Sequence, residues 1–220
     1  MHNFAELKRQ MIEHQMVARG LRDDEVLSAM SAVPREKFVP PELVEFAYSD
    51  EPLPIAARQT ISQPYIVALM VSALQLKPEE RVLEVGTGSG YAAAILSEIA
   101  DQVFTIERQK ILADSARERL LELGYDNVQV RVGDGTLGWP TQAPFDGIVV
   151  AAGGPDVPKA LLQQLSVGGR LVIPVGSEKH RQSLLRIRRI SADEYREEDL
   201  GDVRFVPLIG ISAWQEERPS

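Results

Sequence analysis

The stretch that most limits what this chain can fold into is residues 81–91, RVLEVGTGSGY. It begins with branched apolar residues of the kind that a parallel strand buries on both faces. Three closely spaced glycines follow and allow a tight turn against a ligand, where a Cβ would collide. Residues 92–100 are good helix formers, and the first turn of a helix offers free N–H groups. The stretch therefore predicts a strand, a glycine turn and a helix that together hold a nucleotide-like cofactor.

The spacing of the glycines favours one class of cofactor over another. A dinucleotide site needs G-x-G-x-x-G, with the pyrophosphate at the helix N-terminus, whereas this chain has G-x-G-x-G. Glu84 precedes the first glycine by two residues, where its carboxylate would repel a pyrophosphate but could pair with an ammonium group. S-adenosylmethionine carries such an ammonium and no phosphate. We therefore expect S-adenosylmethionine and not a nicotinamide dinucleotide.

Two further predicted strands bring acidic residues to the same edge of the sheet. Residues 102–107 form a short apolar strand ending in Glu107, about twenty residues after the glycines, where a carboxylate can bind ribose hydroxyls. Residues 128–132 form another strand and lead to Asp134, which could accept a hydrogen bond from an adenine amino group. Alone, Glu107 would be interpreted as a helix cap and Asp134 as a turn residue. Together they mark the edge at which open α/β sheets bind ligands.

Composition argues against several other classes of protein. The chain has 220 residues, 44% hydrophobic and 25% charged, as in one ordinary globular domain. It has no cysteine and only three scattered histidines, so we expect no disulfide, no thiolate chemistry and no metal site. No apolar run is long enough to span a membrane, and the first residues lack a signal-peptide core. We expect a cytoplasmic monomer that has no membrane partner.

The distribution of charge bears on nucleic-acid binding. A net charge of −8 argues against a partner dominated by nucleic-acid phosphates. One segment is locally basic through Lys179, Arg181, Arg186, Arg188 and Arg189. Because apolar residues alternate with these arginines over 183–190, we interpret the segment as a strand with its arginines in water. A peptide carboxylate or a nucleic acid is the less favoured partner for them.

The residues before the sheet predict helices and an irregular connection. Apolar residues recur at helical spacing from Phe4 onward, and a second helix should begin after the cap Asp23 and end before Pro34. Residues 38–54 are broken by prolines, and long connections of this kind often line binding sites.

The segment 59–64 precedes an apolar helix predicted over 66–74. Ser62 lies just before a proline that suits the first turn of that helix, so its side chain could cap the helix. Local spacing alone favours capping over catalysis for Ser62.

The rest of the chain continues the α/β pattern. Strands are predicted over residues 145–152, 167–175, 183–190 and 203–211, with a helix over 159–165. The polar interval 191–202 is interpreted as a hairpin connection, so that an antiparallel pair closes one edge. The predicted fold is an α/β Rossmann-like doubly wound sheet of about seven mostly parallel strands, with helices on both faces and an N-terminal helical extension. We expect one domain over 1–220, with N-terminal helices and the active-site segment over 1–80, a cofactor-binding core over 81–214 and a tail over 215–220.

Three motifs give the chain a resemblance to a known family. They are Gln59-Thr-Ile-Ser-Gln-Pro64, Leu83-Glu-Val-Gly-Thr-Gly-Ser-Gly-Tyr91 and Arg204-Phe-Val-Pro-Leu208. The middle motif is typical of S-adenosylmethionine-dependent methyltransferases, and with the other two the chain resembles the protein-L-isoaspartate O-methyltransferase family over nearly its whole length. The resemblance implies methyl transfer to the free α-carboxylate of L-isoaspartyl residues in damaged peptides and proteins, with S-adenosyl-L-homocysteine as the product.

The resemblance also implies roles for particular residues. Ser62 matches the family's active-site serine, and Val206, Pro207 and Leu208 match a segment that binds the substrate together with it. The positions that match cofactor contacts are Thr60, Ile61, Glu84, Gly86, Thr87, Gly88, Ser89, Gly90, Glu107, Arg108, Asp134 and Gly135. Ile209 and Trp214 depart from the pattern, because some relatives have polar cofactor contacts there.

The implied reaction needs little acid–base machinery. A carboxylate whose pKa is about 4 is already ionised at neutral pH and needs no general base. We therefore expect Ser62 to orient the carboxylate through a hydrogen bond and not to act as a covalent nucleophile. Two alternatives stay open, namely a methyltransferase that acts on RNA or a small metabolite, and a protein that binds the cofactor without turning it over.

Overall fold

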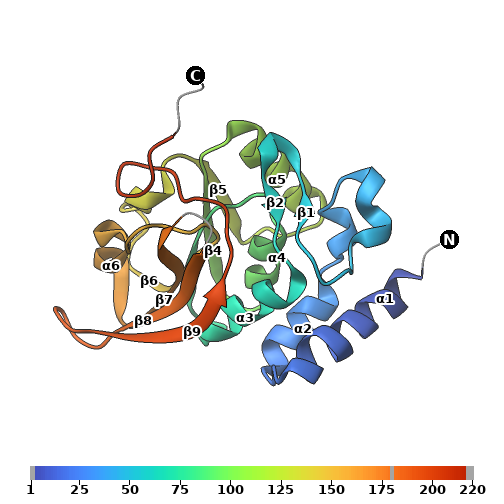
Figure 1. Ribbon diagram of the computed structural model, residues 1–220, viewed down its shortest axis with the longest axis horizontal. Helices are drawn as coiled ribbons and strands as arrows, with labels where there is room; N and C mark the ends of the chain where they lie inside the picture. The colour runs from blue at the N-terminus through green and yellow to red at the C-terminus, as the bar shows by residue number, and fades with distance from the viewer. Residues whose placement is uncertain (1–2, 179–180, 217–220) are drawn as a thin grey trace.

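The computed structural model describes residues 3–178 and 181–216, and its centre is a seven-stranded sheet (Figure 1). The strands lie in the order β5-β4-β3-β6-β7-β8-β9. The strands from β5 to β7 are parallel, and β8 and β9 run antiparallel at one edge. Their bounds are β3 Arg81–Val85, β4 Gln102–Glu107, β5 Val128–Val132, β6 Phe145–Val150, β7 Leu165–Glu178, β8 Arg181–Arg189 and β9 Tyr195–Val203. The predicted Rossmann-like α/β class is confirmed.

Two apolar cores lie on opposite faces of the sheet, because side chains alternate along each strand. Val82 and Val103 belong to one core, and their neighbours Leu83 and Phe104 belong to the other. The first core includes residues of α3 (Pro64–Leu74), α4 (Tyr91–Ser97) and α5 (Lys110–Glu122), and the second includes Leu161 of α6 (Lys159–Gln164). Helices therefore cover both faces, and the carboxyl ends of the parallel strands meet along one edge.

The N-terminal extension consists of short helices whose ends follow local rules. α2 (Asp24–Ala32) begins after Asp23, whose carboxylate accepts a hydrogen bond from Val26 N–H at 3.2 Å, and it ends before Pro34, as predicted. The other helical segments are α1 (Phe4–Gln10), η1 (Met11–Met16), η2 (Val17–Arg19), η3 (Arg35–Lys37), η4 (Pro41–Phe46), η5 (Ala56–Arg58) and, after β5, η6 (Gly135–Leu137). In the portion of the chain that the structure describes, none of the helices combines the length and apolar character that a bilayer span requires.

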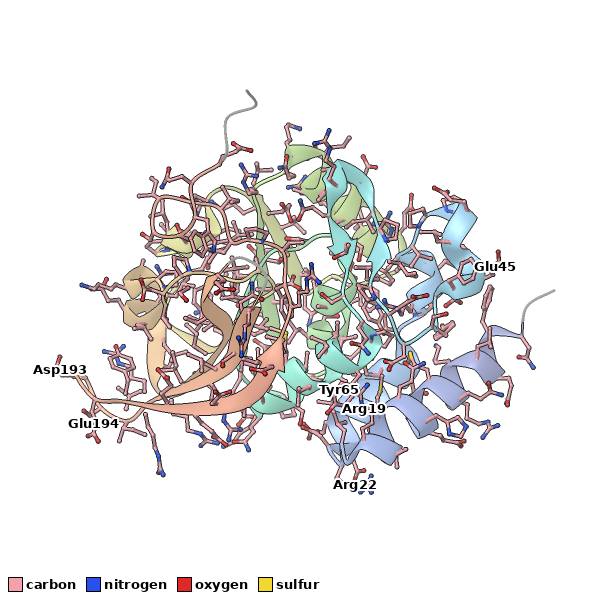
Figure 2. The ribbon with its side chains drawn as sticks, viewed as in Figure 1. Arg19, Arg22, Glu45, Tyr65, Asp193 and Glu194 are labelled. Atoms are coloured by element: carbon pink, nitrogen blue, oxygen red, sulfur yellow. The ribbon has the colours of Figure 1, made fainter. Side chains whose placement is uncertain are left out.

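The extension packs directly on the sheet. Met16 and Met30 are fully buried in the same apolar core as Val82 of β3. The guanidinium of Arg19 lies over the ring of Tyr65, 3.6 Å from its centroid, and Figure 2 shows these two side chains where the extension meets the start of α3. The extension is thereby fixed to the helix that follows the short hairpin of β1 (Leu53–Pro54) and β2 (Thr60–Ile61).

The prediction for the last strand is wrong. We expected a strand over 203–211 and a connection over 191–202, whereas β9 covers Tyr195–Val203 and pairs with β8. An edge strand has a neighbour on one side only, so the polar residues of β9 suit that position. Pro207 lacks an N–H group, and the apolar residues around it leave the sheet to run beside Gly153, which follows β6.

The basic segment lies in and beside β8. Arg186 forms an ion pair with Glu198 of β9, and Arg189 donates to the carbonyl oxygen of Leu165 at 2.6 Å. These arginines bind acceptors of the protein itself. Lys179 of this segment and residues 217–220 of the predicted tail lie outside the described residues.

Arg170 of β7 ties the amino ends of the strands to the end of α3. Its guanidinium binds the Glu80 carboxylate at 2.7 Å and donates to the main-chain carbonyl oxygens of Leu74 and Gln75. Both charged side chains are largely buried, at 7% and 14% exposure. Removing one partner of such a pair leaves a buried charge without compensation.

We expect Arg170→Met to lower the free energy of unfolding by about 3 kcal/mol, because Glu80 and two carbonyl groups lose their donor. Urea unfolding followed by circular dichroism measures the change. Arg117→Met is the control, since Arg117 pairs with Asp114 and donates to Val130 O at the exposed surface, so its removal should change the free energy of unfolding far less. Equal losses in the two variants would contradict this account.

Candidate active site

A cavity lies where the carboxyl ends of the parallel strands meet α3 and the hairpin segment. Four stretches far apart in the sequence form most of its wall: 59–62, 84–89, 106–109 and 205–209. Val67, Met70 and Val71 of α3 add apolar side chains to it. This is the edge at which open α/β sheets bind ligands.

Most of the residues predicted for the site line this cavity. They are Thr60, Ile61, Ser62, Glu84, Gly86, Thr87, Gly88, Ser89, Glu107, Arg108, Gly135, Val206, Pro207 and Leu208. Gly90 and Asp134 do not belong to the wall. Gly90 is the N-cap of α4 with φ +89°, and a Cβ there would lie 3.4 Å from side-chain atoms of Ala116 and Leu120. The structure therefore gives Gly90 a role in the turn and in packing against α5.

Asp134 holds two pieces of backbone together. One carboxylate oxygen accepts hydrogen bonds from the N–H and the hydroxyl of Thr136, at 2.9 and 2.7 Å, and the other accepts from Ile211 N–H at 2.8 Å. Asp134 thus caps η6 and fixes the C-terminal segment to it. Its contact with an adenine amino group stays a prediction.

The glycine turn has the conformation that its sequence predicts. Gly86 and Gly88 have φ values of +98° and +54°, a region that side chains with a Cβ rarely adopt. Gly88 N–H points back to the sheet and donates to a carboxylate oxygen of Glu107 at 3.0 Å. The backbone of the turn therefore lies directly on the cavity wall.

Glu84 is a buried carboxylate on that wall. It is 1% exposed and accepts a hydrogen bond from the Thr105 hydroxyl at 2.6 Å, and this hydroxyl is 2.6 Å from that of Thr87. No ion pair to Glu84 occurs among residues 3–178 and 181–216. Burial raises the pKa of Glu84 to about 8, and the nearby charge of Glu107 adds to the increase. The site therefore favours a cation that would neutralise this carboxylate.

Glu107 is the second carboxylate on the wall. It is 6% exposed, and its two oxygens accept hydrogen bonds from Gly88 N–H at 3.0 Å and Gln109 N–H at 2.9 Å. These bonds fix the side chain against the end of β4 and leave oxygen lone pairs free for hydroxyl donors.

Ser62 lies between β2 and α3 on the cavity wall. The structure places Gln63, and not Ser62, at the N-cap of α3, so the capping interpretation of Ser62 is wrong. Pro64 occupies the first helical position and needs no N–H acceptor. Within the described residues the Ser62 hydroxyl has no hydrogen-bond partner, which leaves it available to a ligand.

The C-terminal strap, residues 205–208, forms the opposite wall. Gly153 anchors it on one edge, because Gly153 N–H donates to Val206 O and Leu208 N–H donates to Gly153 O, both at 2.8 Å. The buried side chain of Gln182 accepts from Phe205 N–H at 2.8 Å. Val206 N–H and Pro207 C=O, by contrast, have no hydrogen-bond partner within the described stretches of the chain.

The two positions that depart from the family pattern have different surroundings. Ile209 lines the cavity next to the strap, whereas Trp214 does not belong to the wall. The indole N–H of Trp214 donates to Gly153 O at 3.1 Å, and its main-chain N–H donates to Leu208 O at 3.0 Å. Trp214 therefore braces the strap from behind.

Several wall residues were absent from the predicted site. Tyr91 follows the third glycine and is 1% exposed, and Phe205 lies at the start of the strap. Met70 and Val71 come from α3, whose sequence is apolar on all sides, so its pattern does not reveal which face meets a ligand. Tyr91 and Phe205 each stand inside a motif quoted for the family resemblance, and that position was the sequence signal that could have identified them.

Comparisons with known proteins agree with one another. The family model for protein-L-isoaspartate(D-aspartate) O-methyltransferase matches residues 6–213. The chain is 60% identical over 204 residues to protein-L-isoaspartate O-methyltransferase 2 of Pelobacter propionicus, covering 93% of this chain and 91% of the relative. It is 56% identical over 210 residues to protein-L-isoaspartate O-methyltransferase of Rhodopseudomonas palustris, covering 96% of each.

A solved structure shows the same similarity at lower sequence identity. A crystal structure from Plasmodium falciparum, described as a protein-L-isoaspartate O-methyltransferase in complex with S-adenosyl-L-homocysteine, superposes with a TM-score of 0.80 at 28% identity. The match covers 95% of this chain and 99% of that one.

Glu84 should make the stability of the ligand-free protein depend on pH. Its pKa is about 8 when folded and about 4.5 when unfolded, so the folded state binds the extra proton between these values. Stability contributed by this group should therefore fall as pH rises from 4.5 to 8 and stay low above 8. We expect Glu84→Gln to be more stable than wild type at pH 8.5, with the difference shrinking toward pH 5.

Urea unfolding at pH 5, 7 and 8.5 measures this difference. Glu122→Gln, on the exposed end of α5, removes the same charge without removing a buried carboxylate and should show a flat difference. A stability difference for Glu84→Gln that does not change with pH would contradict the burial of an ionisable Glu84.

Proposed function

This chain belongs to the protein-L-isoaspartate(D-aspartate) O-methyltransferase family, and from that premise we propose which of its residues carry out the reaction. The enzyme transfers a methyl group from S-adenosyl-L-methionine to the free α-carboxylate of L-isoaspartyl residues in damaged peptides and proteins. The observation that carries the proposal is that one cavity holds a buried acidic wall at Glu84 and an unpartnered hydroxyl at Ser62.

The residues present fit the cofactor. Glu84 is a buried carboxylate without a basic partner in the described residues, and the ammonium group of the amino-acid moiety of the cofactor would neutralise it. Glu107 offers its remaining lone pairs to the ribose hydroxyls. The turn from Gly86 to Gly88 lets the backbone approach the cofactor closely. The other proposed cofactor contacts are Thr60, Ile61, Thr87, Ser89, Arg108 and Gly135, with Gly90 supporting the turn and Asp134 near the adenine.

Ser62 is proposed to orient the accepting carboxylate. The cofactor supplies an electrophilic methyl group, and the substrate carboxylate is ionised at neutral pH, so no residue has to remove a proton. The Ser62 hydroxyl donates a hydrogen bond to one carboxylate oxygen and directs the other toward the methyl group. Ile61, Met70 and Val71 on the same wall keep water from the carboxylate.

The strap is proposed to hold the substrate main chain. One edge of the strap is bonded to Gly153, whereas Val206 N–H and Pro207 C=O have no partner in the described residues. An extended peptide can pair with such free groups as an added strand does. Val206, Pro207 and Leu208 line the cavity with Ser62, so a peptide on the strap has its isoaspartyl side chain next to the serine.

We propose that the enzyme acts on peptides as a cytoplasmic monomer. The basic side chains Arg186 and Arg189 are bound to acceptors of the protein itself, and the net charge is −8, which supports a peptide partner over a nucleic acid or a membrane. Large exposed apolar side chains come from separate elements, such as Ile111 on α5 and Val167 on β7, which supports a monomer. We propose that residues 1–220 act as one cytoplasmic domain, with 1–80 and 81–214 sharing the site.

We expect Ser62→Ala to lower kcat by about 10- to 100-fold, because it removes a hydrogen bond to a charged group. The Kd for S-adenosyl-L-homocysteine should change less than about threefold. Labelled methyl transfer to an isoaspartyl peptide measures kcat, with the normal aspartyl peptide and bulk RNA as controls. Labelling of RNA, or of both peptides equally, would contradict the assigned substrate, and an unchanged kcat would contradict the role of Ser62.

We expect cofactor binding to release a proton from Glu84. At pH 7 the raised pKa keeps the group largely protonated in the free protein, and the ammonium group favours its ionised form. Calorimetry with S-adenosyl-L-homocysteine in buffers of different ionisation enthalpy measures the released proton. Glu84→Gln should bind at least about tenfold more weakly and release none. Binding enthalpies that do not depend on the buffer in wild type would contradict this pairing.

A further inference from the structure

Arg35 is a completely buried arginine directly behind the cavity wall. It is 0% exposed and belongs to η3 of the N-terminal extension. Its Nε–H donates to Ala47 O at 2.7 Å, and an Nη2–H donates to Ser62 O at 2.8 Å. Its guanidinium carbon lies 4.6 Å from the centroid of the Tyr91 ring. One guanidinium thus contacts both the serine segment and the helix that follows the glycine turn.

A contribution to the stability of the fold does not explain why an arginine occupies this buried position. No carboxylate forms an ion pair with Arg35 in residues 3–178 and 181–216, and its Nη1 has no hydrogen-bond partner there. Burial lowers the pKa of Arg35, which shows that the charged form is disfavoured at this position. Burying a charge without an opposite charge costs free energy, so an apolar residue of similar volume would often make the folded protein more stable than arginine does at such a position. Its contacts therefore point to a role in the site.

The contact with Ser62 is the decisive one. Ser62 lies outside both β2 and α3, and within the described residues it makes no hydrogen bond other than the one from Arg35. The guanidinium is a planar fork whose donors keep fixed directions, so bonds to Ala47 O and Ser62 O together set the orientation of the Ser62 peptide group. The ring of Tyr91, itself on the cavity wall, holds the guanidinium from one face.

We propose that Arg35 is a positioning residue for methyl transfer, which fixes the backbone of Ser62 so that its hydroxyl meets the substrate carboxylate. This inference rests on the proposed role of Ser62. Arg35 does not line the cavity, so its proposed effect on the reaction is transmitted through Ser62. A misplacement of about 1 Å at a reacting group can lower the rate about 100-fold, so a positioning residue can matter as much as the group it positions.

A double-mutant cycle tests the proposal, with Arg35→Lys and Ser62→Ala made singly and together. Lysine keeps the charge but has one ammonium in place of a fork, so it cannot hold both carbonyl oxygens in the same geometry. We expect Arg35→Lys to lower kcat for the isoaspartyl peptide about 10- to 100-fold in the wild-type background. In the Ser62→Ala background the same change should lower kcat less than about twofold.

Arg170→Lys is the matched control, because Arg170 is also a buried arginine that binds two main-chain carbonyl groups, at the opposite end of the strands. Arg170→Lys should lower the urea concentration at the midpoint of unfolding as Arg35→Lys does, while its kcat stays within about twofold of the wild-type value. Titration with S-adenosyl-L-homocysteine counts the folded molecules in each sample, so kcat refers to competent enzyme even if a variant is partly unfolded. Where Arg35→Lys does not fold, Arg35→Gln takes its place, because a neutral amide keeps two donors without a buried charge.

The outcomes separate this inference from the proposed function. If Ser62→Ala lowers kcat but Arg35→Lys lowers it by the same factor in both backgrounds, Arg35 does not act through Ser62 and the inference is overturned alone. If Arg35→Lys behaves as Arg170→Lys does, Arg35 is purely structural. If Ser62→Ala leaves kcat unchanged, the proposed role of Ser62 fails and this inference fails with it.

Discussion

The carboxylate of Glu84 is enclosed near the carboxyl end of β3, with the Thr105 hydroxyl as its donor and the cavity on its remaining side. An ionisable group at this position lowers the free energy of unfolding of the ligand-free protein, because the charged form loses its hydration. A cationic ligand reverses that penalty. Binding and stability are therefore coupled through one side chain, and the folded state gains most when the cavity is filled.

The two halves of the cavity are built in different ways. On the cofactor side, β3 and β4 are neighbours in a parallel sheet, so Glu84 and Glu107 reach the same edge as a direct result of strand register. On the proposed substrate side, the segment around Ser62 and the strap belong to no ladder of the large sheet. Side chains contribute bonds to the backbone of both segments: Arg35 binds Ser62 O, and Gln182 binds the strap in addition to the backbone of Gly153. Precision at that wall depends on buried polar side chains.

Local sequence pattern was enough to predict the strands that carry the cofactor side. The three strands over 81–85, 102–107 and 128–132 have the predicted bounds, because each is a short segment rich in branched apolar residues that glycine or an acidic residue ends. β9 was missed because an edge strand of polar residues has no apolar alternation, while the strap has the composition of a strand and lies outside the sheet.

Local sequence pattern likewise identifies only part of the site. Its proposed cofactor residues stand in the motif of residues 83–91, in the motif that contains Ser62, and at the ends of the next two strands, so a resemblance could identify them. A side chain that contacts a segment far away in the sequence is not part of a sequence motif that could identify it. Arg35 is an ordinary charged residue in sequence, and only the fold brings its guanidinium to Ser62 and Tyr91.

The strap comes after β9 in chain order, whereas the rest of the cavity wall, apart from Ile209, lies within residues 59–152. A chain that stops before residue 205 would therefore lack the segment that pairs with Gly153 and would leave the cavity open on that side. The surface that is proposed to bind a peptide requires residues 205–208 to lie beside Gly153. Such a shortened chain would keep the carboxylates at the strand ends and lose the edge that is proposed to hold a damaged protein.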